Sequence, residues 1–153
     1  MSRSDGDPVR ALLAPMSRAN LLVPGSLVAE VLSFVPPSPT DGPNWFLGYI
    51  TWRDRSLPCI DLECLASGSP TMGGSRRRLM VLKLVDTARD DRFVVILLQG
   101  SPRLTRVHAE NLEPDPDGLV AAGIAASMLV DGGRALIPDF AAIAALLDEP
   151  VKA

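Results

Sequence analysis

The pattern of apolar and polar residues from Trp45 to Leu62 (WFLGYITWRDRSLPCIDL) predicts a β-hairpin with Arg53 and Asp54 at its tip. Both faces of the first arm are apolar when side chains alternate, so this arm is covered on both sides or offers one side to a partner. Pro58 cannot donate to a strand ladder, which places the second arm at an edge or a bulge. Both tryptophans of the chain lie on the first arm. This hairpin is therefore more typical of a binding surface than of a catalytic centre.

Other apolar runs predict further short strands. They lie within residues 10–16, 19–23, 76–84, 92–99, 119–130 and 134–137. Residues 26–32 fit either a helical turn or an extended strand, and the pattern leaves this open. Asp61 is expected to cap one helical turn, and Asp139 to cap a C-terminal helix whose buried stripe is Phe140, Ile143 and Leu147. The prediction is a mostly β fold of two small antiparallel, five-stranded SH3-like β-barrels that share a core, with a short C-terminal helix.

A chain of 153 residues suits one domain, predicted here to cover residues 9–148. Residues 1–8 are expected to be a disordered lead-in, and residues 149–153 a tail. The segment ASGSPTMGGS at residues 66–75 is predicted to be a flexible loop at the midpoint of the domain.

Charge and composition then exclude several classes of partner. The net charge of −3 gives no overall field that favours nucleic acid. The polar amino terminus lacks the apolar core of a signal peptide, and the run from Leu119 to Val130 is too short for direct membrane insertion. Cys59 and Cys64, without a secretion signal, indicate reduced thiols in a cytoplasmic protein, and both are best interpreted as small hydrophobic residues.

Residues for catalysis or metal binding are scarce. His108 is the single histidine, the two cysteines do not have zinc-ligand spacing, and no phosphate-binding loop or nucleophile motif occurs. We therefore expect no enzymatic activity, no catalytic or metal-binding residues and no cofactor. Arg76, Arg77 and Arg78 fit either an anionic partner or a solvated strand start, and the solvated strand start is favoured because no aromatic residues are interleaved.

The hairpin also carries a family resemblance. CheW-type adaptor domains have an aromatic residue, Gly, Val-Ile-Asn-Leu-Arg-Gly, a short apolar stretch, Pro, and an apolar pair before Asp-Leu. The segments Gly48–Asp54 and Leu57–Leu62 are similar to this pattern, and Val28-Ala29-Glu30-Val31 is similar to a partner-binding segment of the family. Thr51 replaces the usual Asn, and Asp54 replaces the usual Gly, a change that a left-handed turn tolerates.

The resemblance implies an adaptor that links the cytoplasmic tip of a chemoreceptor to the regulatory domain of a CheA-type histidine kinase. It implies a groove between the barrels for the receptor and an exposed sheet edge for the kinase. The expected partner-binding residues are Val28, Glu30, Gly48, Trp52, Arg53 and Asp54. Such an adaptor serves flagellar chemotaxis or a pilus-motility system. The alternative is a small β-barrel enzyme or ligand-binding protein with its site between the two halves.

Overall fold

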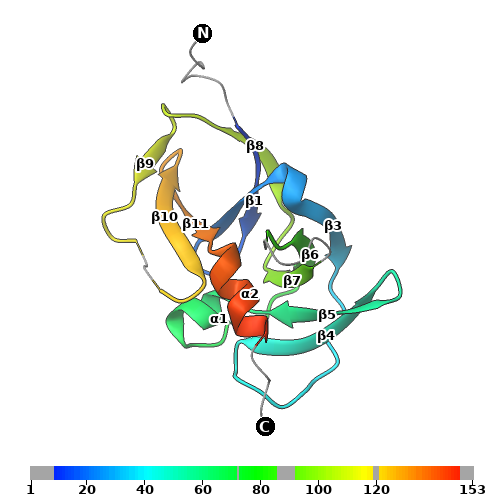
Figure 1. The fold of residues 1–153 in the computed structure, drawn as a ribbon. Helices are drawn as coiled ribbons and strands as arrows, with labels where there is room; N and C mark the ends of the chain where they lie inside the picture. Colours follow the sequence, from blue (N-terminus) through cyan, green and yellow to red (C-terminus); the bar gives the residue numbers. More distant parts are fainter. Residues whose placement is uncertain (1–8, 72, 86–91, 119–120, 149–153) are drawn as a thin grey trace.

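The computed structural model describes residues 9–71, 73–85, 92–118 and 121–148, which form two curved sheets with helices between and beside them (Figure 1). In chain order, the elements of this part are β1 Val9–Pro15, β2 Asn20–Pro24, the 3-10 turn η1 Gly25–Leu27, β3 Val28–Ser33, β4 Phe46–Trp52, β5 Arg55–Ile60, α1 Leu62–Ser67, β6 Arg78–Lys83, β7 Phe93–Leu98, β8 Arg103–Val107, β9 Leu112–Pro114, β10 Ile124–Val130, β11 Gly133–Pro138 and α2 Phe140–Asp148. One sheet has the order β8-β1-β2-β11-β10-β9, and the other β3-β6-β7-β5-β4. The mostly β fold with barrel-like sheets and a C-terminal helix is thus confirmed.

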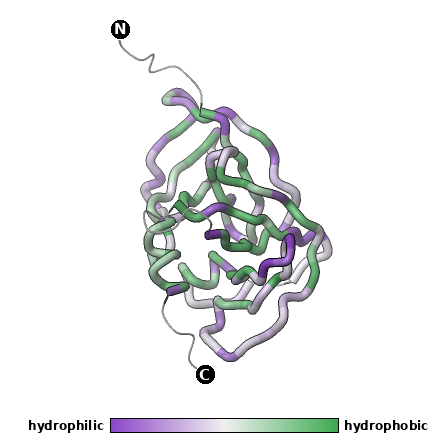
Figure 2. Tube along the Cα trace, turned by 45° about the vertical axis from the view of Figure 1, so that its right-hand side comes forward, coloured by the Kyte–Doolittle hydropathy of each residue, from purple (hydrophilic) through white to green (hydrophobic). Residues whose placement is uncertain are grey.

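The hairpin of β6 and β7 separates two layers of core. Met80 and Leu82 face a large cluster that also takes side chains from the six-stranded sheet and from α2, whereas Leu79 and Val81 face a second cluster within the five-stranded sheet. A third cluster consists of residues of the six-stranded sheet. Strands that are apolar on both faces are typical of positions covered on both sides. Figure 2 shows hydrophobic stretches, drawn in green, in the middle of the molecule.

A bulge changes the face pattern of the β4–β5 hairpin. The register shifts between Phe46 and Gly48, so Phe46 packs in the core between the sheets while Leu47 packs with Ile50 in the other cluster. Strict alternation, which puts Leu47 on the opposite face, is wrong at this point because one extra residue reverses the faces. Beyond the bulge only one face is covered, and Tyr49 is 39% exposed.

The position of Pro58 also differs from the expectation. Strand β5 lies between β4 and β7, so it is not an edge strand, and the bulge is on β4. Its parallel pairing with β7 involves only Cys59 and Ile60. Pro58 therefore lies just before the residues of β5 that pair with β7, so its missing N–H removes no hydrogen bond from the ladder between these two strands.

The two halves repeat one connection. In each sheet one strand pairs in parallel, β5 with β7 and β11 with β2, and then ends at an aspartate that caps a helix. The Asp61 carboxylate accepts a hydrogen bond from the Cys64 backbone N–H at 3.1 Å, and Asp139 accepts one from Ala142 at 3.0 Å. Both predicted caps are confirmed.

Several boundaries differ from the sequence prediction. One sheet has six strands rather than five, because residues 112–114 pair with β10 as a short edge strand that ends at Pro114. Helix α1 includes Ala66 and Ser67 from the predicted flexible loop. Residues 26–32 combine both alternatives, a 3-10 turn followed by β3. The predicted lead-in 1–8 and tail 149–153 lie outside the described residues.

A buried carboxylate joins the two sheets. Glu63, 4% exposed on α1, accepts hydrogen bonds from the backbone N–H groups of Ser17, Arg18 and Ala19 at 2.7, 2.8 and 3.1 Å. These three residues form the turn between β1 and β2 in the other sheet. The contact satisfies backbone donors and fixes the turn of one sheet against the helix that follows the other.

We predict that Glu63→Gln lowers the free energy of unfolding by about 1–3 kcal/mol, because a neutral amide with one oxygen cannot satisfy three donors. Urea denaturation of the variant and of the wild type measures the change. Glu113→Gln, at an exposed position of β9, is the matched control and should change stability little. Equal stability of Glu63→Gln and wild type would show that this contact does not hold the sheets together.

A second carboxylate, that of Asp115, links strands β10 and β11 of the six-stranded sheet. The Asp115 side chain, 2% exposed, accepts hydrogen bonds from Arg134 on β11 and from Ser127 on β10. The Arg134 hydrogen bond is the main reason that the pKa of Asp115 lies below its ordinary value of 3.8.

Because the folded pKa of Asp115 is lowered, its ionised form stabilises the fold above pH 3.8, and this contribution disappears as the pH falls through the lowered pKa. We therefore expect Asp115→Asn to be less stable than wild type at pH 7, with a difference that shrinks as the solution is acidified below pH 3.8. Thermal unfolding from pH 7 to pH 2.5 tests this. A constant difference across the range would contradict it.

Candidate functional site

The tip of the β4–β5 hairpin has an unusual backbone. Arg53 and Asp54 both have positive φ, 48° and 63°, as in the type I′ turns that fit the twist of a two-residue hairpin. The expectation that Asp54 keeps the turn in place of the usual glycine is confirmed. The turn carries the exposed side chains of both residues beyond the sheet.

Three predicted site residues come together at this tip. The Trp52 indole N–H donates to the Glu30 carboxylate at 3.0 Å, and an Arg53 guanidinium nitrogen lies 3.5 Å from the same Glu30 oxygen. The Arg53 guanidinium also lies 4.4 Å from the centre of the Trp52 ring. Trp52 is buried, whereas the Arg53 side chain is 68% exposed and the Glu30 side chain 43% exposed. We call Glu30, Trp52 and Arg53 the hairpin-tip triad.

The triad links the two edge strands of the five-stranded sheet. Glu30 lies on β3 and Trp52 on β4, and no backbone ladder joins these strands in the described part of the chain. The indole hydrogen bond therefore helps to close the sheet into a barrel. By contrast, the ion pair between Arg53 and Glu30 is exposed, and such pairs contribute about 0–1 kcal/mol to stability. Arg53 is thus dispensable for the fold.

Val28 and Gly48 lie apart from the triad. Val28 is half-buried and packs against the core between the sheets. Gly48 is buried, with φ at +127°, and a Cβ at this position would lie 2.0 Å from the Ser38 carbonyl oxygen. Ser38 and Tyr49 exchange two backbone hydrogen bonds at 2.8 and 3.0 Å, so the proline-rich loop between β3 and β4 (residues 34–45) covers the outer edge of β4 at Tyr49. The absence of a side chain at Gly48 is explained by this close approach, without any partner.

An apolar hollow opens at the end of the six-stranded sheet. Its volume is about 230 Å³, and its lining includes Val9, Leu22, Val107, Leu112 and Ile137. Val9 is 59% exposed. The sequence interpretation missed this surface because its residues come from β1, β2, β8, β9 and β11, which only the fold brings together.

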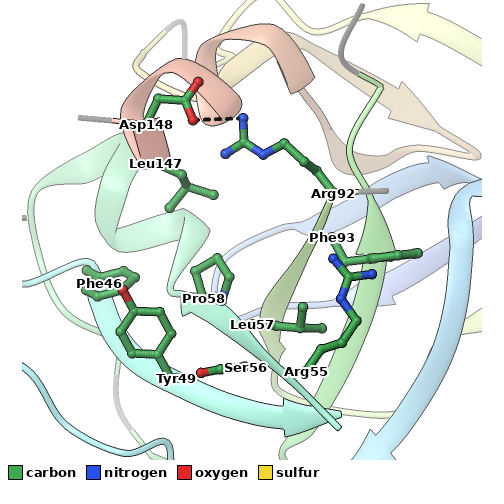
Figure 3. Close-up of a pocket in the computed structure, with 10 residues that line it drawn as sticks. All are labelled: Phe46, Tyr49, Arg55, Ser56, Leu57, Pro58, Arg92, Phe93, Leu147 and Asp148. Carbon is green, nitrogen blue, oxygen red and sulfur yellow. Dashed lines mark ion pairs between the residues drawn. The ribbon is translucent and has the colours of Figure 1, made fainter. Parts of the chain in front are cut away.

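A larger cavity of about 400 Å³ lies between α2 and strands β4, β5 and β7 (Figure 3). One wall of the cavity is apolar and consists of Phe46, Tyr49, Pro58 and Leu147. Arg92 lies on the other side of the cavity (Figure 3). Arg92 is largely buried: it pairs with Asp148 at 3.0 Å and donates to the Ala144 carbonyl at 3.5 Å. Arg92 precedes β7 in the chain and places its positive charge beside the last turn of α2, where a cation is favourable for the helix dipole.

The described residues contain no group of three or more His, Cys, Asp or Glu side chains placed to hold a metal ion. Cys59 and Cys64 are both buried free thiols, and burial raises the pKa of Cys59 to about 12. A thiol with this pKa is not a nucleophile at neutral pH. Within the same residues, no helix is long and apolar enough to cross a membrane.

We predict that Gly48→Ala lowers the free energy of unfolding by roughly 2 kcal/mol or more, because the methyl group meets the Ser38 backbone and φ is strained. Gly25→Ala is the control, since a Cβ there meets no atom within 4 Å. Chemical denaturation of both variants checks the expectation. Equal stability of the two variants would contradict the close approach of the loop to β4.

The comparisons with known proteins agree with this geometry. The CheW-like domain family matches residues 10–148. The crystal structure of the scaffolding protein TtCheW from Thermoanaerobacter tengcongensis superposes with a TM-score of 0.70 at 16% sequence identity, over 88% of this chain and 90% of the other. No curated protein matches the sequence. The chain belongs to the CheW-like domain family.

Proposed function

We propose that this protein is a cytoplasmic, non-enzymatic adaptor of a chemotaxis-type signalling pathway that links the cytoplasmic tip of a chemoreceptor to the regulatory domain of a CheA-type histidine kinase. Membership of the CheW-like family and the scaffold fold support this role. The hairpin-tip triad is the observation that carries it, because it places a mostly exposed arginine on an aromatic support at the end of a rigid hairpin.

Arg53 is suited to partner recognition for a physical reason. Its guanidinium is oriented by the Trp52 ring, so little conformational entropy is lost when a partner carboxylate binds. Its contact with Glu30 is long and exposed, and an incoming acidic group can replace it at small cost. Arginine is enriched among the interface residues that dominate binding energy.

An adaptor needs a second contact, and the apolar hollow at the end of the six-stranded sheet supplies a candidate. It lies on the sheet that does not carry the triad, so two partners can be held at once. Its lining fits an apolar side chain of a partner, and the neighbouring β8 and β9 are edge strands with one unpaired side in the described structure. Two modest contacts on one rigid body gain strength through avidity in an array.

The test is capture of the cognate receptor tip and of the kinase regulatory domain by Arg53→Glu. We expect an unchanged circular dichroism spectrum and about five- to thirty-fold weaker binding of at least one partner. This corresponds to a loss of about 1–2 kcal/mol of binding free energy. Arg53→Ala removes the cation without adding repulsion against Glu30 and should weaken binding in the same direction. Lys83→Glu makes the same charge change at an exposed position of the same sheet and serves as control.

Undiminished capture of both partners by Arg53→Glu would exclude the triad as a partner contact. Failure of the wild-type protein to bind either partner would exclude the adaptor role itself. In that case the cavity beneath α2 is the place to look for a ligand.

A further inference from the structure

The loop before β6 and the end of β3 form a basic hollow that the proposed adaptor role does not use. Its volume is about 380 Å³, and its lining consists of Ser33, Phe34, Gly74, Ser75, Arg77 and Arg78. Ser33 and Arg78 are cross-strand partners at the end of the β3–β6 ladder, so one wall belongs to the sheet. Arg76, exposed, lies next to the hollow in the sequence.

The two arginines that line the hollow are held in place by neutral groups. The Arg77 guanidinium lies 3.9 Å from the centre of the Phe34 ring, and its Nε donates to the Gly74 carbonyl at 3.0 Å. Arg78 donates through Nη1 to the carbonyls of Arg77 at 3.0 Å and Arg76 at 3.4 Å. These contacts orient both guanidinium groups without neutralising their positive charge.

The charge of this cluster is not balanced locally. Ion pairs in the described part of the chain include those of Arg53, Arg92 and Arg134, and within that part none involves Arg76, Arg77 or Arg78. The chain as a whole carries a net charge of −3, so this cluster of three positive charges is a local exception. Planar guanidinium donors held in fixed orientations match the oxygens of phosphate groups, and the two serine hydroxyls add further donors.

From this arrangement we infer that the hollow of Ser33, Phe34, Gly74, Ser75, Arg77 and Arg78 binds a small molecule that carries phosphate groups. Nucleic acid fits less well, because Arg77 occupies a face of Phe34 on which a base would otherwise stack, and the overall charge is negative. An anionic membrane surface is also disfavoured by the net charge. The inference is independent of the adaptor role, since the triad and the apolar hollow contain none of these residues.

The experiment is calorimetric titration of the full chain with inorganic phosphate, pyrophosphate and ATP at constant ionic strength. We expect saturable one-site binding of pyrophosphate or ATP. Arg77→Gln and Arg78→Gln should weaken this binding at least tenfold. Arg103→Gln removes the same charge from an exposed position of β8 and should leave affinity within twofold of wild type.

Two further variants keep the net charge of the protein unchanged. They distinguish binding at a site of defined geometry from non-specific attraction to positive charge. Arg77→Lys loses the planar fork, and Phe34→Leu loses the aromatic support, so each should weaken binding at least threefold while circular dichroism stays unchanged. Unchanged affinity in Arg77→Lys, or an equal loss in Arg103→Gln, would overturn the site. So would the absence of saturable binding to phosphate, pyrophosphate and ATP. Binding only to vesicles of anionic phosphatidylglycerol would overturn it in favour of a lipid surface.

Discussion

The burial of the β6–β7 hairpin on both faces is the constraint on which the rest of the structure depends. Its side chains divide the apolar interior into one cluster between the sheets and another inside the five-stranded sheet. A strand that is apolar on both faces must be covered twice, so each sheet needs the other and neither half has a complete core alone. Helix α2 contributes Ile143 and Ala144 to the cluster between the sheets.

Polar contacts then fix how these layers meet. Glu63 holds the β1–β2 turn, Asp61 and Asp139 cap the two helices, and Arg92 joins β7 to the last turn of α2. Each connects a side chain to backbone groups that are buried or part-buried, where an unpaired donor or acceptor is costly. The result is a rigid frame whose exposed features, the hairpin tip and the sheet edges, keep fixed relative positions. A scaffold requires this property more than it requires reactive groups.

The hairpin-tip triad combines residues that differ in their contribution to the fold. Glu30 and Trp52 join the edges of the five-stranded sheet, whereas Arg53 contributes little to the fold and is mostly exposed. Gly48, grouped with them by the family pattern, has a structural explanation in the close approach of Ser38. Residues that share a family motif therefore have different physical roles in this protein.

The sequence alone determined features that depend on neighbouring residues: the hairpin between Trp45 and Leu62, the turn at Arg53 and Asp54, the two aspartate caps and the strands of β6 and β7. Local alternation and turn chemistry are enough for these. Only the tertiary structure decided which distant residues meet, such as Glu30 with Trp52, Glu63 with the Ser17–Ala19 turn, and Phe34 with Arg77. It also decided the bulge at β4 and the sixth strand, because both depend on what packs against them. The physical reason is that the local pattern of apolar and polar residues encodes whether a side chain is buried. The packing of the whole chain selects the residue that this side chain contacts.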